Sequence, residues 1–240
     1  MPENSILAFS SSRSGNSGFL ETAIPFIASV LGRRQTNIAF IPFASVDNDY
    51  EEYTSKVREA MRNLPYSITA VTPKNAKSVI ETTDVIMVGG GNTFKLLHDI
   101  YELKLLDIIR DKVNNGAAYI GWSAGSNILS PTIGTTNDMP VIQPKSFNAL
   151  GLFPFQINPH YINQKPEGFN GETRDQRLME FLKINPGISI IGLSEGSGLK
   201  LKNNNLQFFG KLPPTLFEQQ EDKSFSRNEI AANSDLSYLL

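Results

Sequence analysis

Short apolar runs rich in β-branched and aromatic residues alternate with helix-like segments along the 240-residue chain. The strand-like runs lie at residues 6–9, 37–43, 67–71, 84–88, 117–122 and 188–193, and the helix-like segments at 19–31, 53–63, 93–113 and 172–184. Strands separated by helices form βαβ units, which predict an α/β fold of three layers: a mostly parallel sheet with helices on both faces. Residues 199–201 and 206–209, joined by an Asn-rich turn, predict a C-terminal β-hairpin.

Length and composition fit a single globular domain over residues 1–240, in which the polar segment 218–233 is expected to be a flexible tail. The formal net charge of −2 gives no electrostatic attraction to nucleic acid or to an anionic membrane. The first residues carry no basic region followed by an apolar run, and no stretch approaches the ~18 apolar residues that span a bilayer. We therefore expect a cytoplasmic protein with no nucleic-acid or membrane partner.

The chain has no Cys and only two His. This excludes disulfides, thiolate nucleophiles, Cys-based zinc sites and any site that needs three imidazoles. If a His acts as a general acid or base, it is His98 or His160.

The run AAYIGWSAGSN at residues 117–127 combines a strand, a G-x-S-x-G pattern and the start of a helix. A Ser on such a tight turn has a strained backbone, and flanking Gly residues avoid the clashes that side chains would cause. The N–H groups that begin the following helix, together with its dipole, are aimed at the oxyanion formed when the Ser attacks a carbonyl. We predict that Ser123 is a nucleophile; the alternative is that the glycines only form a tight turn.

A nucleophilic Ser needs a general base, and that base needs an orienting acid. His160 lies in the loop-like run QINPHY, from which a side chain can reach a cleft, whereas His98 lies inside a helix. We therefore predict His160 as the base. Glu195 follows the strand at 188–193, and Asp138 lies in the loop TTNDMP between nucleophile and base. The residues alone do not choose between these two acids.

Two further features surround this set. The glycine run at 89–91 follows a strand but lacks the spacing of a dinucleotide or phosphate loop. Its N–H groups, at Gly90 and Gly91, suit one half of an oxyanion hole, with the N–H of Ala124 as the other half. Arg174 begins a helix, where a cation opposes the dipole. A bound substrate carboxylate would explain that placement, although a surface pair with Glu172 or Asp175 is the simpler interpretation.

Six stretches together resemble the peptidase E (α-aspartyl dipeptidase) family of serine peptidases, S51. They appear in order over about residues 5–210: FIPFA (40–44), VGGGNTFKLL (88–97), GWSAGSN (121–127), TTNDMP (135–140), NPHY (158–161) and GETRDQR (171–177). The resemblance implies a fold like that of class I glutamine amidotransferases, which is flavodoxin-like. It also implies hydrolysis of dipeptides that begin with aspartate, for which we expect neither a metal nor a cofactor.

The resemblance also implies roles for single residues. Ser123 is the expected nucleophile, His160 the base, Asp138 or Glu195 the acid, and Arg174 the residue that grips the aspartyl carboxylate, in place of the surface pair. We expect a monomer or homodimer acting on Asp-Xaa dipeptides. The alternatives are a cyanophycinase-like enzyme, another serine amidase or esterase on the same fold, and a non-catalytic binder of acidic metabolites.

Overall fold

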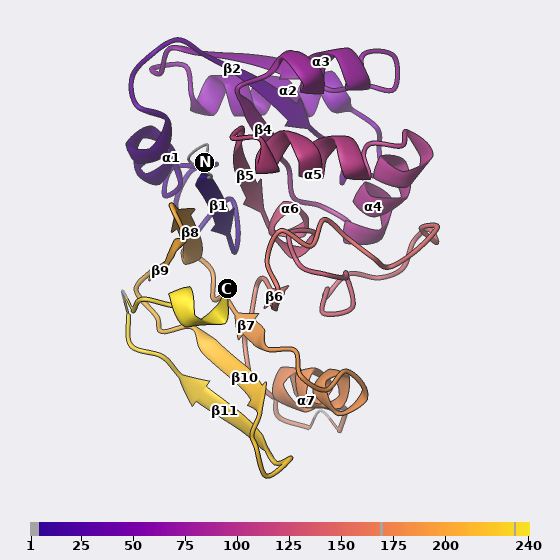
Figure 1. Cartoon of the computed structure of the whole chain (residues 1–240), viewed down its shortest axis with the longest axis vertical. Helices are drawn as coiled ribbons and strands as arrows, with labels where there is room; N and C mark the ends of the chain where they lie inside the picture. Colours follow the sequence, from indigo (N-terminus) through magenta and orange to yellow (C-terminus); the bar gives the residue numbers. More distant parts are fainter. Residues whose placement is uncertain (1–4, 169, 233) are drawn as a thin grey trace.

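Figure 1 presents a computed structural model of the chain, which describes residues 5–168, 170–232 and 234–240. Residues 1–4, on which the prediction of no secretory signal depends, lie outside the described residues, as does Asn233 at the end of the predicted tail. No helix in the described ranges is long and apolar enough to cross a bilayer.

In the described part of the chain, seven strands form the large sheet, in the order β3-β2-β4-β5-β1-β8-β9. Their bounds are β1 (Ser5–Phe9), β2 (Thr36–Ile41), β3 (Tyr66–Ala70), β4 (Val85–Val88), β5 (Ala118–Trp122), β8 (Gly198–Lys202) and β9 (Asn205–Phe209). The first five strands pair in parallel, and β8 and β9 add an antiparallel hairpin at one edge. The predicted α/β class and the hairpin are confirmed.

Helices cover both faces of this sheet (Figure 1). The helices are α1 (Ile24–Leu31), α2 (Tyr50–Ala60), α3 (Ala76–Thr82), α4 (Thr93–Glu102), α5 (Leu106–Asn114) and the short α6 (Ala124–Asn127). Side chains alternate between the two faces of a strand. In β1, Leu7 and Phe9 therefore join the core under α1 and α2, while Ile6 and Ala8 join the core under α3, α4 and α5. This alternation produces the three predicted layers.

A second, smaller sheet lies below the first in Figure 1, with its described strands in the order β11-β10-β7-β6. Its elements are β6 (Gln156–Asn158), β7 (Ile190–Gly192), β10 (Thr215–Gln219), β11 (Phe225–Glu229) and the covering helix α7 (Arg174–Ile184), and a 3₁₀ turn (Ser237–Leu239) ends the chain. Leu178 and Leu182 of α7 pack on Ile190 and Phe217 of this sheet. The sequence predicts the strand at 188–193 but assigns it to a single sheet, which is wrong.

The elements that the sequence does not predict are short. β6 has three residues and α3 buries only Ala76 and Ile80, so neither has a periodic pattern that would predict it.

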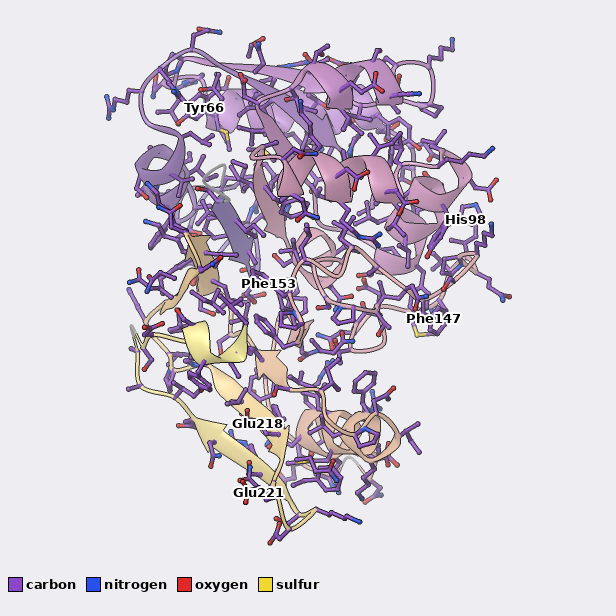
Figure 2. The ribbon with its side chains drawn as sticks, viewed as in Figure 1. Tyr66, His98, Phe147, Phe153, Glu218 and Glu221 are labelled. Carbon is purple, nitrogen blue, oxygen red and sulfur yellow. The ribbon has the colours of Figure 1, made fainter. Side chains whose placement is uncertain are left out.

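α1 begins at Ile24 rather than at residue 19, because Pro25 occupies its first turn and Leu20 has a φ of 58°. β11 lies within the polar segment 218–233 and pairs with β10, which ends at its start, and Glu221 stands at the turn between them (Figure 2). The flexibility of that segment and the single domain stay predictions.

Candidate active site

Ser123 sits on a strained turn between β5 and α6. Its φ of 52° and ψ of −114° lie in a region that residues with a side chain rarely adopt. The turn is fixed on both sides, because the Ser123 N–H donates to Phe9 O at 3.1 Å and its carbonyl accepts from Ser126 N and Asn127 N, each at 2.9 Å. Strain of this kind costs about 1–3 kcal/mol and persists only where the surroundings enforce it.

Two glycines allow that turn to pack against the end of β4. A Cβ on Gly125 would lie 2.3 Å from Val88 O, and a Cβ on Gly90 would lie 2.9 Å from the Ser123 Cβ. Both distances are shorter than any real Cβ contact. Gly125 of G-x-S-x-G and Gly90 of the glycine run therefore serve close packing around the turn as well as the turn itself. The sequence predicts only the turn.

His160 reaches Ser123 from the smaller sheet, two residues after β6. Its Nε2 lies 2.9 Å from Ser123 Oγ, and its Nδ1 lies 2.9 Å from Glu195 Oε1. With Nδ1–H donating to Glu195, Nε2 is left to accept from the Ser123 hydroxyl. The backbone of His160 is itself at a φ of 51°, and its N–H donates to Ser10 Oγ at 2.9 Å. The side chains of His160 and Glu195 are 41% and 55% exposed.

Asp138, the other candidate acid, lies elsewhere. Its Oδ2 accepts from the N–H of Thr93 at 2.7 Å, from the hydroxyl of Thr93 at 2.6 Å and from the hydroxyl of Thr136 at 3.1 Å. These bonds cap the start of α4. Among the hydrogen bonds of the described residues, none joins Asp138 to His160, so the structure brings Glu195 and not Asp138 to the imidazole.

Two of the three predicted oxyanion donors, Gly90 and Ala124, lie next to Ser123, and Gly91 follows Gly90 in the same turn. Ala124 is the first residue of α6, and the glycine turn lies beside Ser123. Within the described ranges, the N–H groups of Gly90, Gly91 and Ala124 donate no hydrogen bond to a protein acceptor. α6 has only four residues, so local N–H groups rather than a long helix dipole are available to an anion.

The model of peptidase family S51 matches residues 6–209. The chain belongs to peptidase family S51. It is therefore a serine peptidase of the dipeptidase kind, and the matched range includes Ser123, His160 and Glu195.

Proteins named peptidase E are similar to this S51 peptidase over most of its length. One from Shewanella amazonensis is 46% identical over 235 residues, which cover 98% of each chain. One from Haemophilus influenzae is 49% identical over 200 residues, which cover 82% of this chain and 92% of that protein. The crystal structure of a peptidase from an acI-B1 actinobacterium has the same fold, with a TM-score of 0.64, 15% identity and coverage of 97% of this chain and 96% of that one.

A cavity of about 800 Å³ opens beside His160 and Glu195 in the S51 peptidase. Among the described residues that line this cavity, Arg227 of β11 carries a positive charge. No pattern in the sequence indicates Arg227 as a site residue. Arg227 is already neutralised: its Nε lies 2.9 Å from Asp175 Oδ2, and its Nη2 lies 3.3 Å from Glu229 Oε1. Its pairing leaves little charge for a substrate.

Arg174 is not among the described lining residues, but it is close to them. The next residue, Asp175, accepts from the hydroxyl of Tyr161 at 2.5 Å, and Tyr161 lines the cavity. Burial, with a smaller contribution from Arg177, lowers the pKa of the Arg174 guanidinium from its ordinary value. No hydrogen bond or ion pair of Arg174 occurs within the part of the chain that the structure describes. The predicted surface pair with Glu172 or Asp175 is therefore absent there, and Arg174 is a half-buried cation that lacks an anion.

Several supporting residues have no signal in the sequence. Tyr53 accepts from Trp122 Nε1 at 3.1 Å and donates to Gly90 O at 3.0 Å, which ties the glycine turn to the strand before Ser123. Asn137 donates to Pro159 O at 2.7 Å and thereby supports the loop that carries His160. His98, by contrast, lies on α4 at the outer edge of the molecule, where Nδ1 contacts Gln143 O (Figure 2). It belongs to a helix, as predicted.

Proposed function

We propose that the chain hydrolyses dipeptides with an N-terminal aspartate through an acyl-enzyme on Ser123. The observation that carries this proposal is the continuous hydrogen-bonded series from Ser123 Oγ through both nitrogens of His160 to Glu195, with 2.9 Å at each step. A binder of acidic metabolites has no need of a strained nucleophile in contact with a base and an acid.

Acylation follows from this geometry. The Ser123 oxygen attacks the aspartyl carbonyl carbon while its proton passes to His160 Nε2. Glu195 holds the imidazole in the required tautomer and stabilises the imidazolium that forms. The N–H groups of Gly90, Gly91 and Ala124 are free to stabilise the oxyanion. His160 then gives its proton to the leaving amine as the C–N bond breaks.

Deacylation uses the same groups in reverse order. A water molecule loses a proton to His160 Nε2 and attacks the ester carbonyl. The oxyanion collapses, the bond to Ser123 Oγ breaks, and His160 returns the proton to that oxygen. The products are free aspartate and the second amino acid, and the enzyme is restored.

Selectivity for aspartate is assigned to Arg174. A half-buried cation without a protein anion gains more from a substrate carboxylate than an already paired one does. The planar guanidinium can bind both carboxylate oxygens, whereas the amide of an asparagine substrate offers one acceptor and no charge. Glutamate carries the same charge one carbon farther from the backbone and should fit less well.

The test compares kcat/KM for Asp-Leu, Asn-Leu and Glu-Leu in wild-type protein and in Arg174→Ala. We expect the wild type to prefer Asp-Leu, and the variant to lose about 100-fold on Asp-Leu while changing little on Asn-Leu, since hydrogen bonds to charged groups contribute about 1.5–3 kcal/mol. Arg177→Ala, which removes an exposed cation one turn further along α7, is the matched control.

Two results would contradict the proposal. Equal wild-type rates on all three dipeptides would remove the aspartate assignment. If Arg227→Met abolishes the Asp/Asn preference while Arg174→Ala leaves it intact, the cation in the cavity wall binds the substrate, and the role given to Arg174 is wrong.

A further inference from the structure

Asp138 has no part in the mechanism above, yet it lines the same depression as Gly90, which abuts Ser123. All of its side-chain hydrogen bonds with the described residues are accepted by Oδ2, from Thr93 and Thr136. No such bond reaches Oδ1 in the described ranges. Because a carboxylate has about four acceptor sites and this side chain is half-buried, Asp138 can accept further hydrogen bonds while it caps α4.

The surroundings of Asp138 favour a cation. It lines a depression of about 530 Å³ together with Gly90 and Gly91, and Gly90 abuts Ser123. Asp47 adds a second carboxylate to the same wall. Among the described residues of that wall, Lys56 carries the positive charge, and its Nζ already pairs with Glu52 at 2.6 Å. The depression therefore carries negative charge that its own residues do not neutralise.

The direction of the substrate follows from the strand order. β5, which ends at the nucleophile, lies between β1 and β4. His160 approaches on the β1 side, because its N–H donates to Ser10, which directly follows that strand. The base gives its proton to the leaving amine, so the leaving residue lies on the His160 side. The residue whose carbonyl is attacked then extends toward the β4 side, where Asp138 lies.

We propose that Asp138 binds the α-ammonium group of the substrate's first residue. In a dipeptide that group is roughly 2.5 Å from the attacked carbonyl carbon, because one carbon separates them. Asp138 thereby makes the enzyme prefer substrates with a free N-terminus. The aspartyl side chain leaves the same carbon in another direction and can turn back toward Arg174 on the His160 side, so Arg174 and Asp138 recognise two different groups. This inference rests on the dipeptidase function proposed above.

The test uses Asp-Leu and succinyl-Leu, which is Asp-Leu without its α-amino group. The wild type should cleave Asp-Leu with a kcat/KM about 10- to 100-fold higher, the range expected for one charge-assisted hydrogen bond. Asp138→Asn keeps acceptors for Thr93 but removes the charge. It should reduce the ratio of the two substrates to within about threefold, through loss on Asp-Leu alone.

A pH series adds a readout that a purely structural role would not change. The wild-type ratio should fall as pH rises through the substrate's amino pKa, near 8, because the neutral amine no longer pairs with a carboxylate. In Asp138→Asn the ratio should be independent of pH. Asp84→Asn is the matched control, since Asp84 also accepts a backbone N–H, from Asn37 at 3.0 Å, but lies at the opposite end of β4.

Each outcome decides the question. A wild type that cleaves both substrates equally overturns the proposal, whether or not Asp138→Asn folds. An equal loss on both substrates in Asp138→Asn also overturns it and leaves Asp138 as a helix cap. If the wild type prefers other first residues over aspartate, only the proposed aspartate selectivity fails, and Asp138 is tested in the same way with Ala-Leu against propionyl-Leu.

Discussion

The two halves of the site are held in different ways. The nucleophile belongs to the large sheet, and the residues after it, from Ala124 to Asn127, are fully buried. His160 and Glu195 belong to the smaller sheet and its loops, and about half of each side chain is exposed. Tight packing can maintain a strained backbone, whereas an exposed pair depends on its hydrogen bonds in water. Packing therefore holds the predicted nucleophile in place, whereas hydrogen bonds hold the predicted base and its acid.

The largest effect should come from Ser123→Ala. Loss of the nucleophile is expected to lower kcat by about 10⁴- to 10⁶-fold, while Tm stays within about 2 °C because the half-exposed hydroxyl leaves no core cavity. Kinetics of leucine release and thermal unfolding measure both quantities. The control is Ser126→Ala, which deletes a buried hydroxyl bonded to Phe9 O at 2.7 Å and should lower Tm by about 2–4 °C. Residual activity above one part in a hundred would place the nucleophile elsewhere.

A smaller effect is expected on the exposed side. Glu195→Gln should lower kcat by about 10- to 100-fold, less than the ~10⁴-fold loss known for a buried orienting acid, because water can partly replace the exposed carboxylate. Tm should not change, since a surface pair contributes about 0–1 kcal/mol. The same two assays apply. A loss as large as that of Ser123→Ala, or no loss at all, would contradict the contrast between the two halves.

The smallest effect on chemistry, and a clear effect on stability, should come from Gly125→Ala. The added Cβ would meet the Val88 carbonyl at 2.3 Å, and overpacking of this kind costs about 1–3 kcal/mol. Chemical denaturation measures that loss, and the protein that remains folded should retain most of its kcat. Gly187→Ala is the control: it has a φ of 83° but open space around it, so it reports only the backbone cost. Equal losses in the two variants would mean that packing at Gly125 is not tight.

The sequence predicts the large sheet well because its strands are buried on both faces and form continuous apolar runs, such as 85–88. It predicts the strained turn at Ser123 because such a turn restricts residue types over five consecutive positions, and the role of Ser123 as nucleophile stays a prediction. The smaller sheet escapes prediction, since three-residue strands such as β6 are defined by long-range pairing. For the same reason the sequence cannot choose between Asp138 and Glu195, which differ only in which loop folds back on His160.

The proposed reaction also depends on how the two sheets are placed relative to each other. The bond between Ser123 Oγ and His160 Nε2 joins residues positioned by different sheets, and at 2.9 Å it tolerates a displacement of only a few tenths of an ångström before it weakens. A slide of about 1 Å between the sheets would stop catalysis while every strand stayed paired. We therefore expect mild denaturation to abolish activity before it disrupts secondary structure. A ligand that contacts both sheets should stabilise the active site and the fold.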